Sequence, residues 1–403
     1  MYVEWDQFEG SERGDSGEVT YRLAGTPHVF QIQARATDDC MLQVLFENLS
    51  AAGNPKGSVL PLGWMHNRST VFILAGTEGH FVSNQLPTNW MQMNRDVLSA
   101  RSLRHLCIPG AHDAGMSQYN GHTFLAKPCN TLTQVTSIYG QLERGVRYFD
   151  LRPVISSGEF WTGHYSHIEI FGSWQGANGQ SIASIIDDVN RYTEYFGELI
   201  ILRLSHDLNT DVGNSSYRPF NQEEWNGLFK NLLRVHRRFI VDDPRRIDLT
   251  ALPLDTFIGQ GNSAVILLID PSDPEVRVGE YANHGFYSTW NFNTFDSYSN
   301  TADPSVMMAD QLDKLEQKRK SPDDSYFLLS WTLTQNALQA ATCSLGTANS
   351  ILDLASQANP LIYRHLLPKC SRRTYPNILY LDQISSPTVA ALAMAVNTVS
   401  AAD

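Results

Sequence analysis

The feature that most constrains the fold of this chain is an alternation of two patterns after about residue 102. Short runs rich in apolar and β-branched residues alternate with longer stretches of amphipathic, helical spacing. The expected strands are Leu103–Ile108, Val146–Leu151, Glu159–His164, Leu199–Leu204, Ala264–Ile269, Gly285–Trp290, Tyr326–Thr332 and Ile378–Leu381. The expected helices include Ser181–Tyr195, Gln222–Phe239, Met307–Lys320, Ala348–Leu366 and Thr388–Val399. This alternation predicts an α/β fold, a (β/α) barrel made irregular by missing or short helices after its first two strands.

The N-terminal part of the chain has a different pattern. From about Gly17 to Val82, short β-rich runs such as VTYRLAG and VFQIQARA are separated by Gly, Pro, Asn and Asp, which predicts an all-β module. The length of 403 residues also favours two domains, since single cores seldom grow beyond about 250 to 300 residues. We expect a small β-rich accessory domain over residues 1–90 and a catalytic barrel over residues 91–403.

The charge and the hydropathy of the chain exclude several classes of protein. With 30 basic and 42 acidic residues the net charge is -12, which argues against a nucleic-acid partner. No apolar run is long enough to span a bilayer, and the N-terminus MYVEWDQFEG lacks the pattern of an export signal. We therefore expect a soluble monomer, cytoplasmic or peripheral to a membrane rather than secreted, whose membrane contact, if any, is local.

The cysteines do not suggest a metal site. Cys40, Cys107, Cys129, Cys343 and Cys370 include no CxxC or CxxH spacing, so zinc-finger-type sites are excluded. An odd and sparse set is typical of free thiols, which is the interpretation that we favour. A bridge between Cys343 and Cys370 is the alternative if the natural protein is exported.

Titratable residues collect where the expected barrel strands end, which is where such barrels hold their active sites. These residues are His112, Asp113, Arg152, His164, His206 and Asp382. Two imidazoles, a carboxylate and a guanidinium suit cleavage of a phosphodiester by an internal hydroxyl: one imidazole accepts a proton, the other donates one, and the guanidinium holds the phosphate oxygens. This inventory requires no metal ion. For each histidine taken alone, a structural hydrogen-bonding role is the alternative.

Four motifs resemble the X domain of phosphatidylinositol-specific phospholipase C. They are CIPGAHDAG (Cys107–Gly115), QLERGVRYFDLRP (Gln141–Pro153), WTGHYS (Trp161–Ser166) and ELIILRLSH (Glu198–His206), and the resemblance extends from about Leu103 to Asp382. The resemblance implies a distorted TIM-type barrel. It also implies a reaction in which the inositol 2-hydroxyl attacks the phosphate, giving an inositol cyclic phosphate and diacylglycerol.

The same resemblance gives roles to individual residues. It implies that His112 is the general base, oriented by Asp382, and that His164 is the general acid, supported by Asp113. Arg152 would bind the phosphate. The substrate contacts implied for the headgroup are Asp296 and Tyr298, with His206 at the end of the fourth strand.

The residue at position 152 decides which branch of that family the chain resembles. Arg152 stands where calcium-dependent members have a calcium-binding carboxylate, so the chain resembles the bacterial, metal-independent branch, and we expect neither a metal ion nor another cofactor. That branch has a lysine ending the fourth strand and an arginine ending the fifth, whereas this chain offers Ser205 or His206 and then Asp270. The partner is expected to be a phosphoinositide or a related lipid headgroup, and a glycosylated, differently phosphorylated or non-inositol headgroup stays open.

Two other functions stay open beside a phosphodiesterase of this type. The altered substrate contacts would also suit a catalytically impaired barrel that binds a lipid or sugar headgroup. A phosphodiesterase acting on glycerophosphodiesters or sphingolipids is the third reading, but its metal-binding acidic pair on the second strand would be broken by Arg152.

Overall fold

The computed structural model describes residues 86–401 throughout and, before them, the backbone of seven strands. These strands are β1 (Tyr2–Glu4), β2 (Ser16–Arg22), β3 (Val29–Ala36), β4 (Met41–Phe46), β5 (Val59–Trp64), β6 (Val71–Thr77) and β7 (His80–Ser83). Strands β2 to β5 form one antiparallel sheet in sequence order, and β6 lies between β1 and β7 in a second. The predicted β-rich N-terminal part is confirmed, while a domain boundary at residue 90 stays a prediction.

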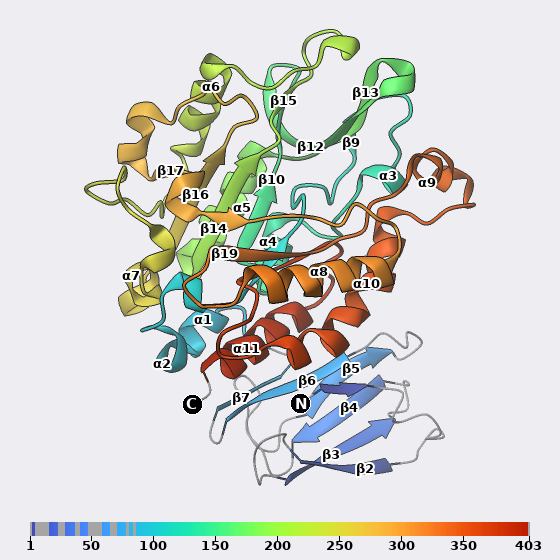
Figure 1. Cartoon of the computed structure of the whole chain (residues 1–403), viewed down its shortest axis with the longest axis vertical. Coiled ribbons are helices and arrows are strands. Elements are labelled where there is room, and N and C mark those ends of the chain that lie inside the picture. The colour runs from blue at the N-terminus through green and yellow to red at the C-terminus, as the bar shows by residue number, and fades with distance from the viewer. Residues whose placement is uncertain are drawn as a thin grey trace.

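The rest of the chain is built on a curled sheet of eight parallel strands (Figure 1). In spatial order they are β17 (Phe286–Ser288), β16 (Ala264–Asp270), β14 (Leu199–Ser205), β10 (Tyr148–Leu151), β8 (Ile108–Ala111), β20 (Ile378–Leu381), β19 (Tyr326–Trp331) and β18 (Thr294–Phe295). No ladder joins the two edge strands, β17 and β18, both of which lie in the fully described part of the chain. The barrel is therefore open at one place, which we call the seam.

Helices cover the outside of this sheet, as predicted. The five predicted helices are α5 (Ile182–Tyr195), α6 (Gln222–Leu232), α8 (Pro304–Lys318), α10 (Ile351–His365) and α11 (Thr388–Ala401). The predicted extension of α6 to Phe239 is wrong, because the helix ends at Leu232. Side-chain caps define the starts of α5, α6, α8 and α10: Asn221, for example, accepts a hydrogen bond from the backbone of Glu224 at the start of α6. Helix α11 is apolar nearly all round and correspondingly buried, because it packs between β8 of the barrel and β6 of the N-terminal sheet.

A second sheet, at the end of the barrel that carries the site, was not predicted. Its order is β15 (Leu208–Asn209), β11 (Pro153–Ser156), β12 (Glu159–Ile168), β13 (Ser173–Ser181) and β9 (Asn120–His122). The prediction that Glu159–His164 is the third barrel strand is wrong, because β12 pairs antiparallel with β11 and β13. Its exposed and buried residues are mixed, whereas the barrel strands β8, β10 and β20 are buried throughout. The eighth barrel strand is β18, which has only two residues.

The first barrel strand also begins later than predicted. Leu103–His105 forms a turn of 3-10 helix, and β8 starts at Ile108. Within β8, Gly110 lies so close to the neighbouring strand that a Cβ there would meet Ile378 at 2.5 Å. The IPGAH motif therefore packs β8 tightly against β20 and brings the residues that follow both strands together.

The cysteine prediction is wrong for two of the five residues. Cys129 and Cys343, 214 residues apart in sequence, form a disulfide with a Cα–Cα distance of 6.0 Å. The alternative bridge from Cys343 to Cys370 is also wrong, since Cys370 and Cys107 are free thiols. Cys40 lies outside the described residues. Within the described residues, no helix combines the length and the hydropathy needed to cross a membrane.

Candidate active site

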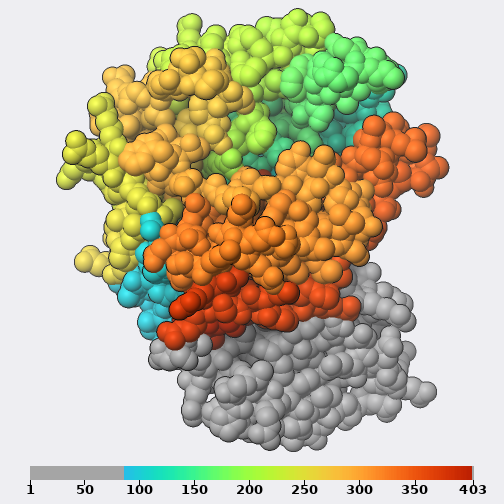
Figure 2. Space-filling model, in the orientation of Figure 1, coloured from blue at the N-terminus to red at the C-terminus, as the bar shows by residue number. Residues whose placement is uncertain are grey.

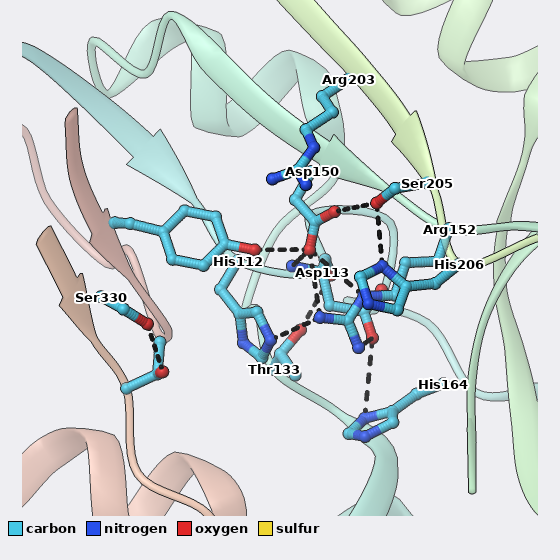
Figure 3. Close-up of polar contacts among 12 residues, drawn as sticks. His112, Asp113, Thr133, Asp150, Arg152, His164, Arg203, Ser205, His206 and Ser330 are labelled. Atoms are coloured by element: carbon cyan, nitrogen blue, oxygen red, sulfur yellow. Dashed lines mark hydrogen bonds and ion pairs between the residues drawn. The ribbon is translucent and has the colours of Figure 1, made fainter. Parts of the chain in front are cut away.

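The predicted catalytic residues gather at the C-terminal ends of the barrel strands (Figure 3). His112 and Asp113 follow β8, Arg152 follows β10, and Asp382 follows β20. His164 comes from β12 of the second sheet and reaches the group from the side. The structure thus brings all five together, although one of them stands on an element other than the one predicted.

His112 lies between an acid and a guanidinium. Its Nδ1 is 2.7 Å from Oδ1 of Asp382, whose side chain is 2% exposed, and its Nε2 is 2.8 Å from Nη2 of Arg152. Because a guanidinium has only donors, Nε2 must accept, and Nδ1 must then donate its proton to Asp382. Burial and Arg152 disfavour the charged imidazolium, but the charge and hydrogen bond of Asp382, together with the charge of Asp150, outweigh them, so the pKa of His112 is raised.

Arg152 is held by two buried carboxylates. Its Nε donates to Oδ2 of Asp150 at 3.2 Å, and its Nη1 lies 3.6 Å from Oδ2 of Asp113. Asp150 also accepts hydrogen bonds from the hydroxyls of Tyr380 at 2.5 Å and Ser205 at 3.2 Å. Burial alone would raise the pKa of Asp150, but the adjacent Arg152 and the neighbouring histidines hold it well below its usual range. Asp150 therefore stays ionised and fixes the guanidinium.

His164 and Asp113 lie opposite each other, and burial disfavours the charged form of each. The Nδ1 of His164 lies 3.1 Å from the carbonyl oxygen of Thr131 and 3.7 Å from Oδ2 of Asp113. Burial, with Arg152 and His112 nearby, lowers the pKa of His164 to about 3, and burial raises the pKa of Asp113 to about 7. Among the described residues, neither carboxyl oxygen of Asp113 has a hydrogen-bond partner. An anion bound beside Arg152 would favour the charged form of His164 and raise its pKa.

The predicted substrate contacts are more dispersed. His206 lies next to Ser205, whose hydroxyl is 2.9 Å from its Nδ1, and has a positive φ of 54°. Asp296 accepts a hydrogen bond of 2.7 Å from Nη1 of Arg203. Tyr298 is 59% exposed, and its side chain makes no hydrogen bond to the other predicted site residues. Of the three, His206 is adjacent to the catalytic residues. Asp296 is hydrogen-bonded to Arg203, which lies beside Asp150 on the next strand, and Tyr298 does not contact the catalytic residues through a hydrogen bond.

Arg203 is a further charged residue of the site that was not predicted. This residue lies on β14 in register with Asp150 and also donates to Oδ2 of Asp270 at 2.7 Å. It supplies a cation near the ends of the fourth and fifth predicted strands, where no lysine or arginine was expected. The sequence did contain a sign of this role, since Arg203 is the one charged residue of the apolar run LIILRLS. A charged side chain on a buried strand needs a partner inside the barrel.

No family model matches this chain. A protein of Dictyostelium discoideum described as PI-PLC X-box domain-containing is 29% identical to it over 139 residues. The match includes 31% of this chain, and the chain spans about 17% of the length of that relative.

Solved structures of bacterial phosphatidylinositol-specific phospholipases C share the fold. One from Staphylococcus aureus that carries pentafluorophenylalanine has a TM-score of 0.54 at 16% identity, covering 78% of this chain and 98% of that one. Another, described for modulation of the membrane binding of the S. aureus enzyme, has a TM-score of 0.53 at 16% identity, with the same coverage. The Listeria monocytogenes enzyme has a TM-score of 0.50 at 18% identity, covering 74% and 95%. The predicted distorted TIM-type barrel is confirmed.

Proposed function

Since the chain resembles PI-PLC X-domain proteins in sequence and bacterial phosphatidylinositol-specific phospholipases C in fold, we propose that it is a phosphodiesterase acting on a phosphoinositide-type lipid. A ring hydroxyl of the headgroup attacks phosphorus, and the bond from phosphorus to the glycerol oxygen breaks. The products are a cyclic phosphate and a diacylglycerol. The observation that carries the proposal is the convergence of His112 and His164 on Arg152, which contacts both the base and the carboxyl group beside the acid.

The base side of the proposal rests on the contacts of His112. Its Nδ1 proton is committed to Asp382, so Nε2 is the atom that accepts the proton of the attacking hydroxyl. In the free site Nε2 is bound by Arg152. Binding of an anionic phosphodiester draws the donors of Arg152 toward the phosphate oxygens, which frees Nε2 for the hydroxyl.

The acid side depends on the substrate. His164 has a pKa of about 3 in the free site and would carry no proton at neutral pH. The phosphodiester brings a negative charge and offsets the charge of Arg152, and both effects raise the pKa of His164. Its Nδ1 is anchored by the Thr131 carbonyl, so Nε2 donates the proton to the leaving glycerol oxygen.

Arg152 takes the part that a metal ion plays in other phosphodiesterases. Its guanidinium is fixed by Asp150 and is permanently charged, so it binds the phosphate oxygens and stabilises the charge of the transition state. The proposal therefore requires no divalent cation, and turnover is expected to persist in excess EDTA. Loss of activity in EDTA that calcium restores would contradict it.

Exposed apolar side chains around the site support a lipid substrate. Phe124 follows β9, Ile170 and Phe171 lie at the tip of the β12–β13 hairpin that carries His164, and Leu338 lies on α9 (Ala337–Thr342). Phe124 is 88% exposed and Ile170 is 86% exposed. The disulfide of Cys129 joins α3 (Pro128–Thr131) to the turn that follows α9. Of the exposed apolar side chains, Ile170 and Phe171 are adjacent at one hairpin tip, where both could bury apolar surface in a bilayer.

Turnover of two substrates tests the proposal. His112→Ala and His164→Ala should each lower hydrolysis of soluble inositol 1,2-cyclic phosphate and of phosphatidylinositol in vesicles by about 10²-fold or more. His236→Ala is the matched control, because His236 is exposed in a separate surface cleft with Asp187 and Arg234. Unchanged turnover in either site variant would contradict the mechanism.

The low pKa of His164 in the free site favours one second candidate, a barrel that binds headgroups without cleaving them. The same preparation separates the two functions. Saturable binding of inositol 1-phosphate, together with no product from inositol 1,2-cyclic phosphate or phosphatidylinositol after long incubation, would support the binding module instead of the enzyme.

A further inference from the structure

A buried segment, residues 131–134, connects the parts of the chain that carry the two proposed catalytic histidines. At its start the carbonyl oxygen of Thr131 lies 3.1 Å from Nδ1 of His164. Further along, the hydroxyl of Thr133 donates to the carbonyl oxygen of Asp113 at 2.9 Å (Figure 3). The last residue of the segment, Gln134, takes no part in the proposed chemistry, yet all its side-chain hydrogen bonds lie on the base side of the site.

The side chain of Gln134 joins the loop that follows β8 to the loop that follows β20. Its Nε2 donates to the carbonyl oxygens of His112 at 2.9 Å and Leu381 at 3.0 Å, and its Oε1 accepts from the backbone N–H of Ile384 at 3.1 Å. A carbonyl oxygen can only accept, so the amide has one possible orientation, and both of its N–H groups are used. Gln134 is 1% exposed, and on the face shown in Figure 2 later parts of the chain largely cover the blue-green part to which it belongs. Solvent therefore cannot replace these bonds.

These bonds hold the backbone on both sides of Asp382. Gln134 binds the residue before Asp382 and the second residue after it, and the carbonyl oxygen of Thr133 accepts from the backbone N–H of Gln383 at 2.8 Å. Gln383 has a positive φ of 53°, a conformation that residues other than glycine rarely adopt, so the turn after Asp382 needs such support. The backbone of His112 is bound by the same amide, and Oδ1 of Asp382 lies 2.7 Å from Nδ1 of His112.

The contact between His112 and Asp382 is sensitive to the distance between the two loops. It keeps the proton of the imidazole on Nδ1, which leaves Nε2 as the proton acceptor, and it raises the pKa of His112. Of the groups that could occupy position 134, an amide suits both loops at once. A carboxylate would place oxygen against two carbonyl oxygens, and an apolar side chain would leave those buried carbonyls without this donor.

We propose that Gln134 is a positioning residue for the base, which joins the two loops so that His112 and Asp382 stay in contact. Its effect on turnover rests on the proposed function, whereas its effect on the contact itself does not. Since Thr131 of the same segment holds His164, the proposed base and the proposed acid share one support.

Gln134→Met tests this role, because methionine has a similar length and flexibility and lacks the amide. We expect the pKa of His112 to fall by about 0.5–1, a part of the roughly 1–3 that a contacting opposite charge can supply. This pKa is measured by NMR of the imidazole protons, assigned with His112→Ala. For inositol 1,2-cyclic phosphate, kcat should fall about tenfold and KM should change less than about twofold, because the amide acts through the base and not on bound substrate. Gln134→Asn keeps an amide with a shorter reach and should change both quantities in the same direction.

Gln180→Met is the matched control. Gln180 is also 1% exposed, and its side chain makes three hydrogen bonds, to Ser184, Asp188 and the backbone N–H of Ile138. None of these partners is a proposed catalytic residue. The control should therefore lose comparable stability in urea unfolding while the pKa of His112 and kcat stay at their wild-type values.

The outcomes separate positioning from a general loss of stability. In the Asp382→Asn background the contact is already changed, so Gln134→Met should add little to the fall in the pKa of His112. Wild-type values of this pKa and of kcat in both Gln134 variants would overturn the proposal, as would an equal fall of both in Gln180→Met. Failure of both Gln134 variants to fold would also overturn it, since Gln134 would then maintain the fold as a whole. If the wild type turns over no substrate, the pKa of His112 still decides this proposal, and only the proposed function fails.

Discussion

Asp382→Asn tests the proposed base most directly. The substitution keeps the size of the side chain and removes the negative charge that Nδ1 of His112 faces at 2.7 Å. Asp382 raises the pKa of His112, so its loss should lower that pKa. The amide can also present its NH₂ group to Nδ1. That would force the proton onto Nε2, where it would oppose the donors of Arg152 and block the base.

The size of the effect follows from the burial of this contact. A hydrogen bond to a charged group contributes about 1.5–3 kcal/mol, and the Asp382 side chain is only 2% exposed, so solvent screens little of it. If that stabilisation is lost in the transition state, kcat/KM should fall about 10- to 150-fold. His112 has a raised pKa in the folded protein, so its pairing stabilises the fold below its unfolded pKa, and this is lost as the pH rises through the folded value. The variant should therefore lose more stability at pH 5 than at pH 9.

The assay is kcat/KM for inositol 1,2-cyclic phosphate against pH, with urea unfolding at both pH values. We expect the acidic limb of the profile to move to lower pH, because the base of the variant loses its proton more readily. Asp313→Asn, at an exposed acid on α8, is the matched control. An unmoved acidic limb with kcat/KM within about twofold of wild type would refute the assigned dyad.

Three further predictions test other parts of the site. Arg152→Lys should lower kcat/KM for a soluble substrate by about 10²-fold with little change in KM. The reason is that a lysine cannot contact His112, Asp150 and the phosphate together. Steady-state kinetics that match those of the wild type would contradict this. Asp113→Asn should raise the free energy of unfolding at pH 8 by at most about 4 kcal/mol and should lower activity. The pKa of Asp113 is raised to about 7 in the folded protein, so ionising this buried carboxyl costs stability as the pH rises from 3.8 to 7. Equal urea midpoints of the variant and the wild type at pH 8 would argue against this. Replacing Cys129 and Cys343 together by serine should lower the free energy of unfolding in urea by about 2–5 kcal/mol without reductant. Reductant should bring the free energy of unfolding of the wild type closer to that of the variant. A variant as stable as the oxidised wild type would exclude a stabilising bridge.

The apolar barrel strands and the helices between them could be predicted from sequence because each is a local pattern. The run AVILLID of β16 is buried almost throughout, and the periodicity of α5 places its apolar face on the sheet. β18 could not be found in this way, since two residues carry no periodicity. β12 was recognised as a strand but assigned to the wrong sheet, because pairing partners depend on contacts distant in sequence.

The same distinction between local patterns and contacts distant in sequence applies to the candidate site. His112, Asp113 and Arg152 stand in motifs beside strands whose ends the sequence marks, and their convergence follows from the parallel order of β8 and β10. The pairing of Arg203 with Asp270 and Asp296 joins residues up to 93 positions apart, and the disulfide joins residues 214 apart. Neither pairing leaves a local pattern. Both depend on which distant segments the folded chain brings together.

The loop that the disulfide closes contains some of the site residues and leaves the others outside it. The loop that it closes contains β10, with Asp150, and the segments that carry Arg152 and His164, whereas β8 and β20, followed by His112 and Asp382, lie outside it. These two strands pair with each other and contact the loop through β10 and β19. If the β8–β20 pair detaches, the proposed base leaves the proposed acid while the remaining chain stays covalently closed. Catalysis would then fail before the hydrodynamic radius changes much, which would make turnover a more sensitive reporter of early unfolding than molecular size.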